Sequence, residues 1–134
     1  WKYGPRVYDI GDSSFQSASH AFIGVGLRPL SPIHVRGIQV VDGLQISWMR
    51  RTRIGGDGWE QTDVPLGESG EAYEIDIMDG GSAVRTLSSN QQSAIYSSSQ
   101  QTADFGAPQP SYTVRIYQIS ASHGRGQARE AMIP

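Results

Sequence analysis

The apolar residues of this chain recur at every second position in three separate segments. These segments are residues 44–49, 73–78 and 112–117, and each alternates apolar with polar or small side chains. The side chains expected to share a buried face are Leu44, Ile46, Trp48, Tyr73, Ile75, Ile77, Tyr112, Val114 and Ile116. Successive side chains of a β-strand point to opposite faces, whereas a helix repeats about every 3.6 residues. The alternation therefore predicts three strands, each with one face in a core.

Four weaker segments and the turns between them extend this pattern. Further strands are predicted at Ile33–Val41, Ala83–Leu87, Ala94–Tyr96 and Gly126–Ile133. Turns are predicted at Asp42-Gly43 and at Asp79-Gly80-Gly81, because these residue types favour tight reversals. About seven short strands separated by turn residues are typical of an all-β fold, the antiparallel β-sandwich.

One segment, residues 98–105, departs from the alternation. It begins with serine, it is followed by Gly106, and Thr102 is its single β-branched residue. Serine caps the start of helices, and glycine ends them in the left-handed conformation. We therefore expect a short helix or 3₁₀ turn that crosses from one sheet to the other, with Phe105 closing the bottom of the core.

Size and charge limit the classes of protein to which the chain can belong. Its 134 residues are the usual size of one domain, and 11 basic against 13 acidic residues leave a formal net charge of −2. Such a balance provides no electrostatic field that would draw nucleic acid or an anionic membrane. The sequence has no cysteine for disulfides or thiolate sites, and no apolar run long enough for a membrane-spanning helix. We expect neither nucleic-acid binding nor membrane insertion.

Residues 1–30 lack a sustained period, although they contain several aromatic side chains among glycine, serine and aspartate. Segments of this composition do not build a core of their own. We interpret residues 1–30 as an arm or linker from a preceding domain and residues 31–134 as the sandwich, with Pro29 and Pro32 stiffening the junction. Because the chain begins at Trp1 rather than at methionine, we expect a piece of a longer protein or a processed one.

Side chains that could form a catalytic or metal site are dispersed. The three histidines, His20, His34 and His123, lie far apart in the sequence, and no serine lies in a Gly-x-Ser-x-Gly motif. No catalytic, metal-binding or cofactor-binding residue is therefore predicted, and we do not expect an enzyme.

The connection Gly55–Glu71 is long and acidic. Its carboxylates lack the spacing of a twelve-residue calcium loop, and they are Asp57, Glu60, Asp63, Glu68 and Glu71. We expect this loop to be solvated by charge, with some of its acids paired to the nearby arginines Arg50, Arg51 and Arg53.

The same loop contains Trp59 in a polar setting. A tryptophan there either packs onto its own domain, beneath the arginines or at the edge of the sandwich, or serves as an anchor for a partner. Both interpretations stay open. The candidate interaction residues are Trp59, Arg51, Arg53 and Tyr117, of which Tyr117 is expected on the outer face of its strand.

The order of certain residues resembles that of a fibronectin type III domain. The matching positions are Pro32, Trp48, Tyr73, Tyr112, Gly124 and Gly126. The resemblance covers about residues 31–134 and implies that Tyr112 hydrogen-bonds back across a corner, that Trp48 fills the core, and that Tyr73 lies on the third strand. Together with Phe105, these three residues are the expected structural core. The long loop and the helical turn depart from the family pattern.

Four separated blocks carry a narrower resemblance. They are GLRPLSPIHVRG, SWMRRTRIGGDGWEQTDVPLGESGEAYEIDI, IYSSSQQTADFG and RIYQISASHGRG. Together they resemble the C-terminal portion of the large tail-tip or baseplate protein, or host-specificity protein, of alphaproteobacterial gene transfer agents and related siphophages. The resemblance implies a structural protein of the virion tail tip, extracellular when released. Its implied partners are other tail or baseplate proteins, further copies of itself, and a glycan or receptor on the host surface.

The sequence is also compatible with a second function. The chain would then be a carbohydrate-binding accessory module of a secreted bacterial enzyme, with Trp59 and Tyr117 as rings that stack on sugars. Tail-hub domains upstream in the parent polypeptide would favour the first function, and a glycosidase domain would favour the second.

Overall fold

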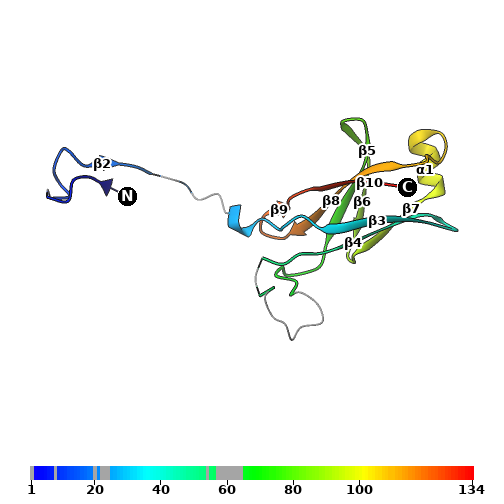
Figure 1. The fold of residues 1–134 in the computed structure, drawn as a ribbon, viewed down its shortest axis with the longest axis horizontal. Helices are drawn as coiled ribbons and strands as arrows, with labels where there is room; N and C mark the ends of the chain where they lie inside the picture. Colours follow the sequence, from blue (N-terminus) through cyan, green and yellow to red (C-terminus); the bar gives the residue numbers. More distant parts are fainter. Residues whose placement is uncertain (1, 8, 20, 22–24, 54, 57–64) are drawn as a thin grey trace.

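The structure, a computed structural model, describes residues 2–7, 9–19, 21, 25–53, 55–56 and 65–134, and within them two antiparallel sheets pack face to face (Figure 1). The first sheet has the order β3-β4-β7, which are Ile33–Val40, Gly43–Met49 and Ser93–Ser97. The second has the order β10-β8-β5-β6, which are Arg129–Ile133, Tyr112–Ser120, Tyr73–Asp79 and Ser82–Ser89. A short strand, β9 (Gly124–Arg125), also pairs with β8. The predicted all-β antiparallel sandwich is confirmed.

The last strand differs from its prediction. A strand was expected over Gly126–Ile133, but β10 begins only at Arg129, and the short strand β9 before Gly126 was not predicted. The backbone N–H of Gln127 donates to the carbonyl of Pro29 at 3.0 Å instead of to a strand. The N-terminal linker therefore takes the place of a pairing partner at this point, which local sequence could not indicate.

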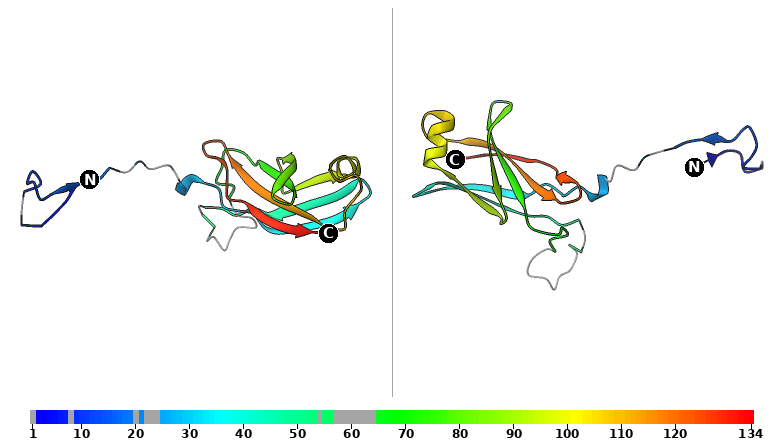
Figure 2. Two further views of the ribbon diagram at one scale, coloured as in Figure 1. Left: turned by 90° about the horizontal axis from the view of Figure 1, so that it is seen from above. Right: turned by 180° about the vertical axis from the view of Figure 1, so that it is seen from behind.

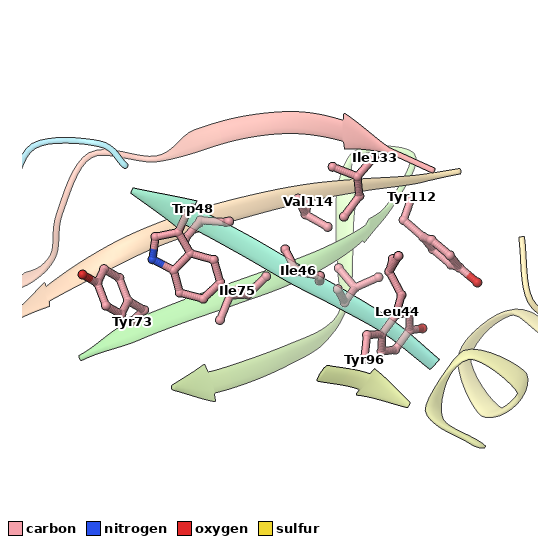
Figure 3. Close-up of a cluster of buried hydrophobic side chains, with 11 residues drawn as sticks. Leu44, Ile46, Trp48, Tyr73, Ile75, Tyr96, Tyr112, Val114 and Ile133 are labelled. Carbon is pink, nitrogen blue, oxygen red and sulfur yellow. The ribbon is translucent and has the colours of Figure 1, made fainter. Parts of the chain in front are cut away.

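Aromatic rings and aliphatic side chains fill the space between the sheets (Figure 3). Trp48 and Tyr73 lie at one end of this core, with their rings edge to face and centroids 5.1 Å apart. Tyr96 and Tyr112 meet at the other end at 5.4 Å, and Phe105 packs on Tyr112 at 5.6 Å. Edge-to-face packing of this kind stabilises a core beyond the area that it buries.

The helix α1 (Ser98–Phe105) connects β7 of the first sheet to β8 of the second. Ser97 and Gln100 form a reciprocal capping box at its start, and Gly106 ends it in the left-handed conformation with φ 78°. Asp104 binds Arg85 of β6 through two hydrogen bonds and also accepts one from the Tyr96 hydroxyl. The caps thus set the length of the helix, and Asp104 ties it to both sheets.

The hydroxyl of Tyr112 forms the corner that the sequence resemblance implied. It accepts a hydrogen bond from the backbone N–H of Gln109 at 2.7 Å and donates one to the Gln101 side chain at 2.9 Å. Gln101 is buried, and its amide donates in turn to the carbonyl of Tyr96. One phenol therefore connects the strand, the loop before it and the helix.

Replacing Tyr112 with phenylalanine should lower the free energy of unfolding by about 1–3 kcal/mol, because the buried Gln101 oxygen loses its donor. Tyr117→Phe is the matched control, since no hydrogen bond of the Tyr117 hydroxyl occurs within the described part of the chain. Urea denaturation of both variants measures the difference. Equal stability of the Tyr112 variant and the parent would contradict this role.

The N-terminal segment lies apart from the sandwich in all three views (Figures 1 and 2). It contains a two-stranded ribbon, β1 (Lys2–Tyr3) with β2 (Gln16–Ser17), and a 3₁₀ turn, η1 (Val25–Leu27). Phe15 packs against Gly4 so closely that a Cβ there would come within 2.8 Å of the ring. This arm therefore has local contacts of its own and presents most of its apolar side chains to solvent.

Candidate interaction surface at the arm end

Two of the predicted interaction residues hold the N-terminal linker against the sandwich. Arg51 donates to the backbone carbonyl and the hydroxyl of Ser31, at 3.0 and 3.3 Å. Arg53 donates to the carbonyl of Gly26 at 2.9 Å and forms an ion pair with Glu68 at 2.7 Å. Both arginines follow the end of β4, so this strand brings the linker and the base of the long loop together.

Arg50 closes the other side of the same loop. Its guanidinium lies 3.3 Å from Glu71, which also accepts a hydrogen bond from the Tyr73 hydroxyl at 2.8 Å. Burial raises the pKa of Tyr73, and the neighbouring carboxylate of Glu71 raises it further. The expected pairing between loop acids and arginines is thus present for Arg50 and Arg53. Among the described residues, Arg51 instead contacts Ser31 of the linker.

Gly126 is the point where the linker meets the last strands. The carbonyl of Gly126 accepts a hydrogen bond from Arg28 at 3.0 Å, and its N–H donates to Gln118 at 2.8 Å. A Cβ at this position would lie 2.8 Å from Pro29 and from the Gln118 carbonyl, so only glycine allows this approach. We call the contacts of residues 26–31 with Arg51, Arg53, Gly126 and Gln127 the linker clamp.

Gly126→Ala should open the linker clamp, because the added methyl group overlaps backbone atoms that cannot move independently. We expect the amide of Gln127 to lose its protection against hydrogen exchange, while amides of β5 keep theirs. Gly81→Ala is the control, since nothing lies within 4 Å of a Cβ there. Unchanged protection of Gln127, measured by NMR, would show that the linker is not held in this way.

The outer face of the five-stranded sheet, which includes β9, carries a second group of charges, centred on Arg125. Its guanidinium contacts Asp76 through two hydrogen bonds, at 2.7 and 3.0 Å, and also pairs with Glu74. Thr86 donates a further hydrogen bond to Asp76 at 2.6 Å. Asp76 is only 5% exposed, although its position in the alternation placed it on the solvent side.

The predicted interaction residue Tyr117 lies within this second group. The guanidinium of Arg125 is 4.5 Å from the centroid of the Tyr117 ring, a cation–π contact. One face of the ring is therefore covered by a side chain of the same molecule. The sequence pointed to Tyr117 but not to Arg125 or Asp76. The one feature that could have indicated them is the position of an aspartate between two isoleucines of a strand.

Of the remaining residues considered as candidate sites, some lie within the described residues and others lie outside them. Trp59 and the acids Asp57, Glu60 and Asp63 lie outside the described residues, as does His20. His34 lies on β3 and His123 lies in the turn before β9. In the described residues, no three or more side chains of metal-binding type are grouped together. None of the helices there has the length and apolar character needed to cross a bilayer.

Comparison with known proteins does not assign the chain to a family. No family model matches the chain, and a search of curated proteins finds no relative.

Proposed function

We propose that this chain is a structural, non-enzymatic module of a phage-like tail tip or baseplate, serving assembly and contact with the host surface. The resemblance of its four sequence blocks to tail-tip proteins motivates the proposal. The observation that carries it is the linker clamp, which fixes the linker of an outlying arm to the sandwich through Arg28, Arg51 and Arg53. A clamped junction suits a module that must hold a set orientation within an assembly, because a free linker would let it reorient.

The use of charge on the described surface also supports a structural role. Arg53, Arg85, Arg115 and Arg125 each pair with a carboxylate of the same chain. Paired side chains of this kind hold segments of the chain in position. Because each is already engaged in an ion pair, none of these side chains is free to act as an acid or base in proton transfer. The chemistry offered by these residues is therefore that of a scaffold.

The alternative, a carbohydrate-binding module, has weaker support from the residues described. A sugar that stacks on Tyr117 would have to displace Arg125 from the ring face that it covers. If the alternative holds, Trp59→Ala should abolish binding on a glycan array, and Arg125→Ala should strengthen binding at Tyr117. If no glycan binds the parent chain, the alternative is excluded for the glycans on the array.

The tail-tip proposal is tested by locating the protein in particles. Antibodies raised against the purified chain should label one end of tail-like particles in electron micrographs of the producing culture. Serum pre-absorbed with the chain is the control and should remove the label. Antigen found only in the particle-free secreted fraction would contradict the proposal and favour the module of a secreted enzyme.

A further inference from the structure

The outer face of the three-stranded sheet is unusually apolar. Ile38 of β3, Gln45 of β4 and Ile95 of β7 lie in one row across the sheet, as the strand register places them side by side. Ile38 is 59% exposed and Ile95 is 45% exposed. Val40 and Met49 share this side of the sheet by their alternation and are also exposed. We call these four apolar side chains, Ile38, Val40, Met49 and Ile95, the apolar face.

A positively charged hollow borders the apolar face. Its volume is about 270 Å³, and it is lined by His34, Arg36, Ser47, Met49 and the edge of Trp48. His34 has a left-handed φ of 52°, at the irregularity where β3 shifts its register against β4. Within the described residues, Arg36 has no carboxylate partner. The face thus combines exposed apolar area with a cation that is not paired with any carboxylate among the described residues, which is the pattern of a docking surface.

The N-terminal arm has the complementary chemistry. Val7 and Ile10 are 90% and 62% exposed, and Tyr3 is exposed beside them. Asp9 and Asp12 flank Ile10 on either side, whereas the basic residues Lys2 and Arg6 precede Val7. The arm and the apolar face together contain most of the large hydrophobic side chains that the described chain exposes. The arm and the apolar face thus both offer exposed apolar area, and the carboxylates that flank Ile10 are opposite in charge to Arg36.

The linker clamp and the position of the arm are compatible with docking on a second copy. Because residues 26–31 are hydrogen-bonded to the sandwich, the chain leaves it in a fixed direction, and the ribbon β1–β2 lies away from its own sandwich (Figure 2). Docking on a neighbouring molecule leaves this clamp and the position of the ribbon unchanged.

We propose that the arm of one copy docks on the apolar face of a second copy of this chain. Val7 and Ile10 then cover Ile38 and Ile95, and the carboxylates of Asp9 and Asp12 face the hollow at Arg36. Exchange of an N-terminal segment between identical chains needs no change in the sandwich, which makes it a simple route to oligomers. The inference goes beyond the proposed function and does not depend on it, because the purified chain alone is sufficient to test it.

The test is sedimentation equilibrium of the full chain over a wide range of concentrations. We expect reversible self-association that Ile38→Asp weakens by at least about tenfold, as expected for a central apolar contact. Arg36→Glu should weaken it as well, and combining this change with Asp9→Arg and Asp12→Arg should restore it. Val84→Asp, a similar change at an exposed position of the other sheet, is the control and should leave association unchanged.

Three results would overturn the inference. One is a monomer at every concentration, and another is an oligomer that neither Ile38→Asp nor Arg36→Glu weakens. The third is hydrogen-exchange protection of the Val7 and Ile10 amides, which lie outside the ribbon β1–β2, that does not depend on concentration, because it would place the arm on its own sandwich. Should Ile38→Asp fail to fold in circular dichroism, Ile95→Ser serves as the second variant at the same face. Labelling of tail particles would be unaffected by any of these outcomes, so the two proposals can fail separately.

Discussion

Replacing Trp48 with alanine should lower the free energy of unfolding by about 3–5 kcal/mol, the largest loss expected for one residue of this chain. Trp48 is 4% exposed and packs edge to face on Tyr73, so alanine leaves a cavity between the sheets. The indole N–H is buried and has no hydrogen-bond partner within the described residues. Trp48→Phe removes this unsatisfied donor together with part of the ring, and we therefore expect it to cost less than half as much.

Chemical denaturation monitored by circular dichroism measures these changes. Met49→Ala is the matched control, because Met49 is the next residue of β4 and points to the exposed side of the sheet. Its effect should stay within about 0.5 kcal/mol, as is usual for surface positions. If Trp48→Ala were as stable as Met49→Ala, Trp48 would not be a stabilising residue of the core.

Arg125→Gln should have the second largest effect, a loss of about 2–3 kcal/mol at neutral pH. The change leaves the carboxylate of Asp76 buried without its cation, which is the costly way to break an ion pair. This loss of stability is smaller than is usual for breaking a fully buried ion pair, because the Arg125 side chain is 41% exposed. Arg129→Gln is the control, since Arg129 is exposed and has no ion pair among the described residues, and it should leave stability close to that of the parent.

The effect of Arg125→Gln should depend on pH. Burial raises the pKa of Asp76, but hydrogen bonds from Arg125 and Thr86 outweigh burial and hold this pKa below its usual value of 3.8. The pair therefore contributes fully above pH 3.8, and its contribution is lost as the pH falls through the lowered pKa of the folded protein. In the variant, burial acts without the cation, so the pKa of Asp76 should rise above the usual value.

Denaturation curves at several pH values test this dependence. The difference in stability between the parent and Arg125→Gln should be largest near neutral pH and should shrink on acidification. The double variant Asp76→Asn with Arg125→Gln should be more stable at neutral pH than Arg125→Gln alone, because no charge is then left buried. A difference that does not change between neutral and acidic pH would mean that Asp76 is not ionised in the pair.

Much of the fold could be predicted from the sequence because the features involved are local. The alternation in residues 44–49, 73–78 and 112–117 depends only on neighbouring positions, and these segments became β4, β5 and β8. The helix was predicted with its observed bounds, Ser98–Phe105, because its capping residues lie within one turn of its ends. The tyrosine corner was implied by the resemblance to fibronectin type III domains, and the hydrogen-bond partners of Tyr112 lie within eleven residues of it in the sequence.

Much less of the candidate interaction surface could be predicted. Arg51 and Arg53 were expected to pair with acids of the long loop, but the structure also places the linker, 20 and 27 residues away in the sequence, against them. The sequence also indicated Tyr117, yet its ring is covered by Arg125. Trp59 lies outside the described residues, so its role stays a prediction.

Sequence alone determined which segments form strands, which of their faces carry the core and where the helix begins and ends, since these depend on the chemistry of adjacent residues. Only the tertiary structure decided that Asp76 is buried beneath an arginine 49 residues away, and that the last strand begins at Arg129 rather than at Gly126. The physical reason is the same in both cases. Burial and hydrogen-bond partners at these positions come from segments brought together by sheet pairing and by the packing of the linker, and no local pattern encodes that geometry.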